Sequence, residues 1–236
     1  METERQKVVV VSGATGALGG FVVREFLNNS SVNHPFCVIG LDRADAELKF
    51  ESQSNAKVPV YRVNGGDPAS VSAAVTLIEK KHGAIATFVH CMGAFRWSKL
   101  SDISDADVNT LIDANLKSTI YFMRELAIRW HADPKRLGRS IVLLNSKAAQ
   151  SASAGMGVYA ATKIALNALV QAAHEELNSI GVSVNAFLPT IIDTPANRRD
   201  MPGADVSSWV DPAVLAHSIF NLTTRDHNRV SGTLIG

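Results

Sequence analysis

The sequence predicts an α/β fold: a doubly wound parallel sheet of about seven strands with helices on both faces. Three observations predict it. Short β-branched runs alternate with long amphipathic stretches along the 236 residues, which is the pattern of βαβ units. The strand runs lack polar and apolar alternation, as expected when helices cover both faces of a sheet. No internal repeat or linker divides the chain, so we expect a single domain over residues 1–236.

The first half of the chain supplies four of the expected strands. Each is rich in β-branched or aromatic residues, and they span 8–11, 36–41, 58–63 and 85–91. A glycine-rich turn and a helix that runs to Leu27 follow the first strand, and a helix over about 68–81 follows the third. Right-handed crossovers between such strands build a doubly wound sheet.

The second half continues the alternation. Its regular elements are expected as helices over 105–130, 156–178 and 214–220 and as strands over 140–145, 182–188 and 232–235. The stretch 105–130 can form one long helix or two. Gly181 suits a left-handed helix end. The segment of about 189–209 holds three prolines and no regular period, so we expect an irregular loop there, and a loop of that length in a compact domain is usually functional or disordered.

Composition excludes several classes of protein. The 23 basic and 22 acidic residues nearly cancel and form no block of like charge, so nothing indicates a nucleic-acid partner. Cys37 and Cys91 lie in apolar runs, which indicates buried free thiols in a reducing compartment. No apolar run approaches the ~18 residues of a membrane span, and the polar first residues are unlike a signal peptide. We expect a cytoplasmic protein with no membrane association and, because the histidines lack ligand spacing, no metal.

The turn after the first strand reads Ser-Gly-Ala-Thr-Gly-Ala-Leu-Gly-Gly. Its spaced glycines let the backbone approach a pyrophosphate, and the helix that follows offers N–H groups and a partial positive charge. The turn joins the first strand to the first helix, which is the context that dinucleotide binding requires. We expect the cofactor to contact Gly13, Thr15, Gly16, Ala17, Leu18 and Gly19.

Asp42 ends the second strand, 23 residues after Gly19. An acid about 20 residues after the turn typically bonds the adenine ribose. A carboxylate there repels a 2′-phosphate and favours NADH. Arg43 can accept the same phosphate, so NADPH stays possible. The alternative is that Asp42 is only a solvated strand-end acid.

Tyr159 and Lys163 stand four residues apart on an expected helix and so share one face. An ammonium beside a phenol lowers the phenol pKa and makes it a better proton donor near neutral pH. Taken alone, this spacing on a helix usually carries no function. Ser146, however, follows the fifth strand, where its hydroxyl can polarise a substrate oxygen or nitrogen.

Together with Asn115 and the glycine-rich turn, these residues resemble the catalytic tetrad of the short-chain dehydrogenase/reductase superfamily, whose fold is Rossmann-type. The resemblance implies that Tyr159 donates the proton and that Lys163 binds the nicotinamide ribose and lowers the Tyr159 pKa. It further implies that Ser146 orients the substrate and that Asn115 holds a water of the proton relay.

The same resemblance implies further cofactor contacts. Thr194, with Ile192 and the preceding Pro189, matches the position that binds the nicotinamide carboxamide. Asn64 matches an adenine-contacting position. In the segment 90–93, only Gly93 agrees with the motif of the superfamily.

The segment from Asp193 to Trp209 is more specific. It reads DTPANRRDMPGADVSSW and resembles the substrate loop of quinonoid dihydropteridine reductases, as do the segments 13–19, 155–159 and 231–235. That resemblance implies reduction of quinonoid dihydropteridine (dihydrobiopterin) to tetrahydropteridine with NADH or, less tightly, NADPH.

A planar pterin suits flat aromatic walls. The candidate walls are Phe95, Trp97 and Trp209, although Phe95 and Trp97 can equally belong to the core or the rim, and such a structural place is more typical of Trp209. Asn197 and Arg198 can bond the pterin edge or simply pin the loop.

Two residues keep other functions open. Ser146 and Asn115 are more typical of general carbonyl reductases than of dihydropteridine reductases, so an NAD(P)H-dependent carbonyl or quinone reductase is the alternative. A non-catalytic NAD(P)-sensing protein is a second alternative. The helices that begin near Asp105 and Met156 carry apolar positions beyond one stripe, and in this superfamily they form a four-helix interface, so we expect a homodimer.

Overall fold

The computed structural model describes residues 6–31, 35–43, 46–49, 57–135, 138–224 and 230–236. Within them, one sheet has the strand order β3-β4-β2-β1-β5-β6-β7-β8. The strands are β1 (Lys7–Ser12), β2 (Phe36–Asp42), β3 (Ala46–Lys49), β4 (Lys57–Arg62), β5 (Ile85–His90), β6 (Arg139–Leu144), β7 (Val182–Phe187) and β8 (Leu234–Ile235). Seven of them pair in parallel and β3 pairs antiparallel with β4, which confirms the predicted fold class.

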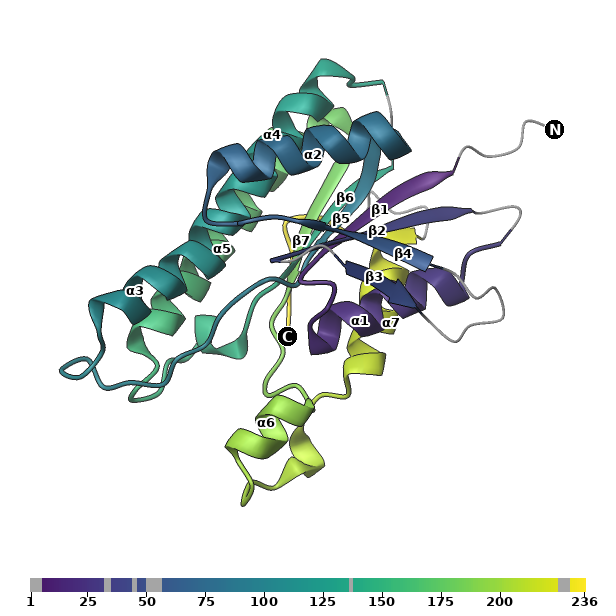
Figure 1. Ribbon diagram of the computed structural model, residues 1–236. Helices are drawn as coiled ribbons and strands as arrows, with labels where there is room; N and C mark the ends of the chain where they lie inside the picture. The colour runs from purple at the N-terminus through teal and green to yellow at the C-terminus, as the bar shows by residue number, and fades with distance from the viewer. Residues whose placement is uncertain (1–5, 32–34, 44–45, 50–56, 136–137, 225–229) are drawn as a thin grey trace.

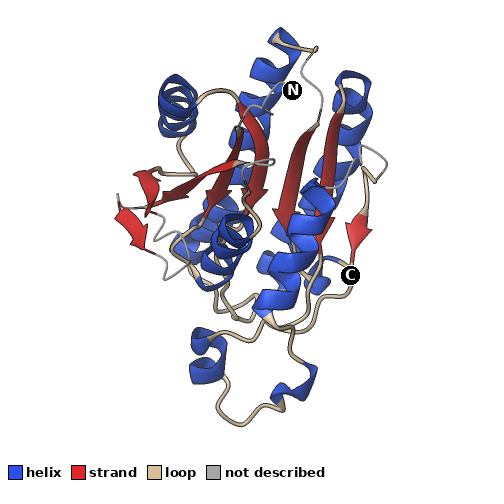
Figure 2. Cartoon of the chain, turned by 90° about the vertical axis from the view of Figure 1, so that its right-hand side faces the viewer, coloured by secondary structure: helices blue, strands red, loops and turns tan. Residues whose placement is uncertain are grey.

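Helices cover both faces of the sheet (Figures 1 and 2). One face carries α1 (Ala17–Asn28) and α7 (Pro212–Thr224). The other carries α2 (Pro68–His82), α4 (Ser118–Ala132) and α5 (Gly157–Leu177). A short α3 (Asp105–Leu111) leads through a π-helical turn (Ile112–Lys117) into α4, so the stretch predicted as one helix or two is continuous but not uniformly α-helical. Among the described helices, none combines the length and apolar character that a membrane crossing requires.

Two hydrophobic cores lie on the two faces of the sheet, because successive side chains of a strand point to opposite sides. In β1, Val8 and Val10 join the core beneath α2, α4 and α5, whereas Val9 and Val11 join the core beneath α1 and α7. All four are at most 2% exposed, as the unbroken valine run predicts for a central parallel strand.

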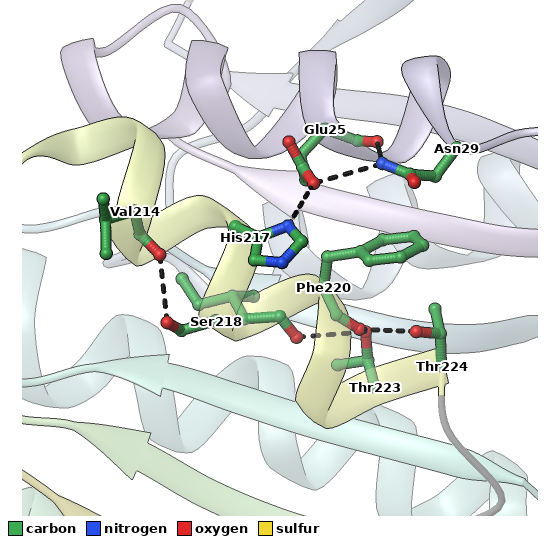
Figure 3. A network of polar contacts seen from close by, with 9 residues as sticks. Glu25, Asn29, Val214, His217, Ser218, Phe220, Thr223 and Thr224 are labelled. Atoms are coloured by element: carbon green, nitrogen blue, oxygen red, sulfur yellow. Dashed lines mark hydrogen bonds and ion pairs between the residues drawn. The ribbon is translucent and has the colours of Figure 1, made fainter.

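Aromatic packing and a polar contact join α7 to α1, and Figure 3 shows the polar contact, between His217 and Glu25. The Phe26 ring of α1 meets the rings of Phe36 and Phe220 edge to face at 5.4 and 5.2 Å. Beside them, His217 Nδ1 lies 2.8 Å from Glu25 Oε1 and so links the two helices at the surface. Such ring pairs contribute roughly 0.5–1.5 kcal/mol each beyond the area that they bury.

Two sequence expectations were wrong. The segment 46–49, Ala-Glu-Leu-Lys, was not predicted as a strand because it lacks β-branched residues, yet it forms the edge strand β3. The segment of about 189–209 is not irregular. It holds α6 (Pro195–Asp200) and a 3₁₀ turn (Val206–Ser208), and a bridge between Ile192 and Val210 closes it at its base.

The sheet reverses its winding at β1. The chain runs outward from β1 through β2 to β4, and then from β5 through β8 on the other side. In such sheets ligands bind at the carboxyl ends of the strands beside this reversal. Ser12 and His90, which end β1 and β5, pair directly, so the loops that follow them begin side by side.

Candidate active site

A cavity of about 600 Å³ lies where the loops after β5, β6 and β7 meet. Parts of the segments 91–97, 144–151, 156–163 and 189–201 line it, and most of the lining side chains are apolar. Among these residues the only charged side chains are Lys147 and Lys163, and none is acidic. The predicted segments that follow three separate strands are therefore brought to one site.

Tyr159 and Ser146 meet in this cavity. Ser146 Oγ accepts a hydrogen bond from Ala148 N at 3.2 Å and so caps the short turn Lys147–Ala149. Burial raises the pKa of the Tyr159 phenol, and its hydrogen bond with Ser146 lowers that pKa by less. The sequence led us to expect a lowered phenol pKa. The net direction is opposite because the desolvation of the ring outweighs its one polar partner.

Lys163 is only 5% exposed. Its Nζ donates to Leu144 O at 2.9 Å and lies 5.9 Å from the centroid of the Tyr159 ring. Burial lowers the pKa of this ammonium to about 8, so the side chain still carries charge at neutral pH. Lys163 and Tyr159 therefore share the cavity, as their spacing predicted, but the cation lies over the ring and bonds a backbone carbonyl.

Asn115 lies in the π-helical turn and is fully buried. Its Oδ1 accepts from Ala94 N at 2.8 Å, and its Nδ2 donates to Ala94 O and to Thr162 Oγ1, each at 3.0 Å. Both amide hydrogens are thus used. Asn115 clamps the loop after β5 to the helix that carries Tyr159, which differs from the water-holding role that the resemblance implied.

The glycine-rich turn is shaped for close backbone approach. Gly13 has a φ of +68°, and a Cβ on Gly19 would lie 2.1 Å from the carbonyl oxygen of Gly13. Gly16 is the N-cap of α1 and makes no side-chain hydrogen bond there. The helix starts with Ala17 and Leu18, and its first turn contains no acidic residue. The N–H groups and positive end of α1 are therefore open to an anion. These features fit the pyrophosphate of a nicotinamide dinucleotide.

Asp42 lies against this turn. Its Oδ2 accepts from Thr15 Oγ1 at 2.6 Å and from Thr15 N at 3.0 Å, and its Oδ1 accepts from Arg43 N at 2.8 Å. These bonds and the nearby Arg43 charge outweigh burial and hold the carboxyl pKa below its usual value. Asp42 is thus a fixed anion at the end of β2 and not merely a solvated acid.

The other expected cofactor residues fall into two groups. The first lines the cavity and consists of Gly93, Pro189, Ile192 and Thr194. Thr194 also caps α6 by accepting a bond from Asn197 N at 3.1 Å. The second group is Asn64 alone. This residue follows β4, is exposed and lies outside the cavity lining, and its Oδ1 accepts a hydrogen bond from Gly66 N at 3.2 Å.

The expected substrate residues also separate. Phe95, Trp97 and Asn197 line the cavity, although Asn197 also donates to Ile192 O at 2.8 Å and so pins its loop. Arg198 and Trp209 are not among the lining residues. Arg198 instead forms a two-point ion pair with Asp193, which accounts for its place in the loop.

Sequence reasoning missed several residues at the site. Cys91 and the methionines Met92, Met156 and Met201 line the cavity. Their positions directly beside the recognised motifs were the available signal. Burial raises the pKa of the Cys91 thiol to about 12, so it is an unreactive apolar wall.

His90 does not reach the cavity. It is 1% exposed and lies between Ser12 Oγ, 2.7 Å from its Nδ1, and Ser118 Oγ, 3.1 Å from its Nε2. Since the Ser118 hydroxyl donates to Ala114 O, it accepts from His90 Nε2–H, and Ser12 donates to Nδ1. His90 is therefore a neutral structural residue, and burial lowers its pKa to about 3.

Comparisons with known proteins agree with this geometry. Residues 7–204 match the family model described as short chain dehydrogenase. A dihydropteridine reductase of Dictyostelium discoideum is 27% identical over 97% of this chain and 93% of its own. An uncharacterized oxidoreductase of Staphylococcus haemolyticus is 24% identical over 95% and 94%. The solved structure of ElxO with NADP bound shares the fold, with a TM-score of 0.83 at 21% identity over 98% and 96% of the two chains.

Proposed function

The chain belongs to the short-chain dehydrogenase family of NAD(P)-dependent oxidoreductases, and we propose that within this family it reduces quinonoid dihydropteridine to tetrahydropteridine. The observation that carries the proposal is the wall of the cavity, where the rings of Phe95 and Trp97 lie at the same site as Tyr159. The resemblance of the segment 193–209 to dihydropteridine reductases and the Dictyostelium relative support the same substrate.

The site offers the parts that hold a nicotinamide dinucleotide. The glycine-rich turn would bind the pyrophosphate, and Asp42 the adenine ribose. Lys163 would bind the nicotinamide ribose, with Thr194 and Ile192 at the carboxamide. The bound dinucleotide would supply the hydride. We propose NADH as the preferred donor, because the anionic Asp42 would repel the 2′-phosphate of NADPH. We do not propose it as the exclusive donor, because ElxO, which shares the fold, is described with NADP or NADPH bound.

Tyr159 is the proposed proton donor. A quinonoid dihydropteridine takes up one hydride and one proton across its C=N system, and no covalent bond to the protein is needed. The phenol is kept protonated at neutral pH by its burial, so it enters the reaction as an acid. Ser146 bonds this phenol and can stabilise the phenolate that remains after proton transfer, and the charge of Lys163 acts in the same direction.

The planar substrate also explains the composition of the cavity. An electron-poor ring gains from contact with aromatic faces and polarisable methionines. No acidic residue among the described lining residues competes for the charge of Lys163.

A carbonyl or quinone reductase is the second candidate, because Ser146 and Tyr159 together form the hydroxyl pair that polarises a carbonyl. Ser146→Ala separates the two. On quinonoid dihydrobiopterin, whose reacting centre is already electron-poor, kcat should fall only a few-fold. On a ketone, the loss of one oxyanion donor should cost about 10²–10³-fold. Steady-state kinetics of both substrates measure this.

Ser153→Ala is the matched control, because Ser153 is an exposed serine outside the cavity lining. It should leave both rates unchanged. A hundredfold loss on dihydrobiopterin in Ser146→Ala would contradict the pterin proposal and favour the carbonyl reductase.

A further inference from the structure

The Trp97 indole rests directly on the backbone of Gly155. A Cβ at position 155 would lie 2.3 Å from Trp97 Cε2 and 2.4 Å from its Nε1. Gly155 has a φ of +81°, which residues with a side chain rarely adopt. Ser98 N donates to Gly155 O at 2.9 Å and fastens the two segments beside the ring. Only glycine at this position leaves the indole where it is.

The fold does not require this ring. Trp97 is 61% exposed and Phe95 is 50% exposed, and neither belongs to the two hydrophobic cores. Both nevertheless line the cavity, and the Phe95 ring meets Tyr159 edge to face at 4.9 Å. Large aromatic side chains that are held in place yet left exposed are typical of binding surfaces.

Gly155 also connects the Trp97 ring to the helix that carries Tyr159. It precedes α5 by two residues and Tyr159 by four, so the indole is seated on the segment that begins the catalytic helix. On the other side, Asn115 clamps Ala94 to Thr162 in the same helix. The loop that carries Phe95 and Trp97 is thus fixed at one end to α5, through Asn115 and Thr162, and at the other to the segment that leads into α5, through Gly155.

We propose that Gly155 is a positioning residue that holds Trp97 as a flat wall of the substrate site, and that this wall selects planar conjugated rings over saturated ones. A wall fixed in advance costs little entropy when a ring stacks on it. The inference deepens the proposed function, on which it rests for the substrate site, but it applies to pterins and quinones alike.

The test measures binding by isothermal titration, in the presence of NAD⁺, of three probes: biopterin, menadione and the saturated ketone cyclohexanone. Trp97→Ala and Gly155→Ala should each raise the Kd for biopterin about tenfold, whereas Trp97→Phe should restore most of the affinity. Gly155→Ala should add less than twofold in the Trp97→Ala background, because it acts through Trp97. The Kd for NAD⁺ should stay within twofold in every variant.

Trp209→Phe is the matched control, since Trp209 is a half-buried tryptophan outside the cavity lining, and it should change no Kd. The inference fails if Trp97→Ala leaves the affinity for every planar probe unchanged, if cyclohexanone loses as much affinity as the planar probes, or if the wild type binds no planar probe. If menadione but not biopterin binds and shows the expected losses, the inference stands and the pterin substrate fails. If biopterin binds and no variant changes its Kd, the pterin substrate stands and the inference fails.

Discussion

Asp42 shows how much of a single residue's role the sequence can predict. Its spacing from the glycine-rich turn predicted a ribose-binding acid, but its partners could not be read from spacing. Thr15, within the turn itself, supplies two of the three hydrogen bonds that orient the carboxylate. Local motifs identify residue types at a site, whereas bonds between residues 27 positions apart depend on the folded sheet.

Asp42 should set the cofactor preference. Because its pKa is lowered, the group stays anionic at neutral pH and repels a 2′-phosphate. The wild type should therefore show a higher kcat/KM with NADH than with NADPH, and Asp42→Asn should move that ratio towards NADPH. Steady-state kinetics with both donors measure the ratio. A wild-type preference for NADPH of tenfold, equivalent to about 1.4 kcal/mol, would show that Arg43 dominates instead.

His90 makes stability depend on pH. Its pKa in the folded protein, about 3, lies below the ordinary value of 6.5. The unfolded chain therefore binds more protons between these values, so the stability from neutral His90 is complete above about pH 6.5 and is lost as the pH falls towards 3. His90→Asn keeps a donor and an acceptor without titrating, so its Tm should fall less between pH 7 and pH 5 than that of the wild type.

An exposed histidine serves as the comparison for that measurement. His131→Asn, at the surface of α4, should leave the pH dependence of Tm close to the wild type. Parallel curves for the wild type and His90→Asn would contradict the structural role assigned to His90.

At the scale of elements, regular period predicted the positions of most helices and strands but not their local irregularities. The helical period over 105–130 was correct, yet a π-helical turn interrupts it where Ser118 and Thr119 donate to the carbonyls of Ala114 and Asn115. Asn115 lies in this turn and bonds Ala94 and Thr162, which are distant in the sequence, so period alone could not reveal the irregularity. The helix α6 escaped prediction for a related reason: it is six residues long, and its Thr194 cap was interpreted as a cofactor contact.

The π-helical turn should contribute to stability as well as to catalysis. Asn115→Ala leaves the N–H and C=O of the half-buried Ala94 without their side-chain partner. An unpaired polar group costs roughly 1–3 kcal/mol when fully buried, so we expect the lower end of that range, about 1 kcal/mol. The free energy of unfolding in urea, without any ligand, should fall by that amount. Asn109→Ala, an exposed position on α3, is the control. Lost turnover at unchanged stability would instead support the water-holding role.

At the scale of the whole molecule, strand burial is what made the fold predictable. Valine and isoleucine runs flanked by amphipathic helices allow few arrangements other than a doubly wound sheet. Membership of the cavity was less predictable, because Arg198 and Trp209 share a motif with Asn197 but lie outside the lining. The homodimer stays a prediction; the exposed isoleucines Ile120, Ile128 and Ile164 on α4 and α5 mark the surface that it would cover.

The most direct test of the central claim is a steady-state comparison of kcat/KM for quinonoid dihydrobiopterin, a quinone and a ketone, each with NADH. We expect dihydrobiopterin to give the highest value. We also expect Tyr159→Phe, which keeps the ring and loses the proton donor, to lower kcat on it by about 10²–10⁴-fold while NADH still binds. A higher kcat/KM for the ketone or the quinone, or a Tyr159→Phe variant that retains wild-type turnover of dihydrobiopterin, would contradict the account.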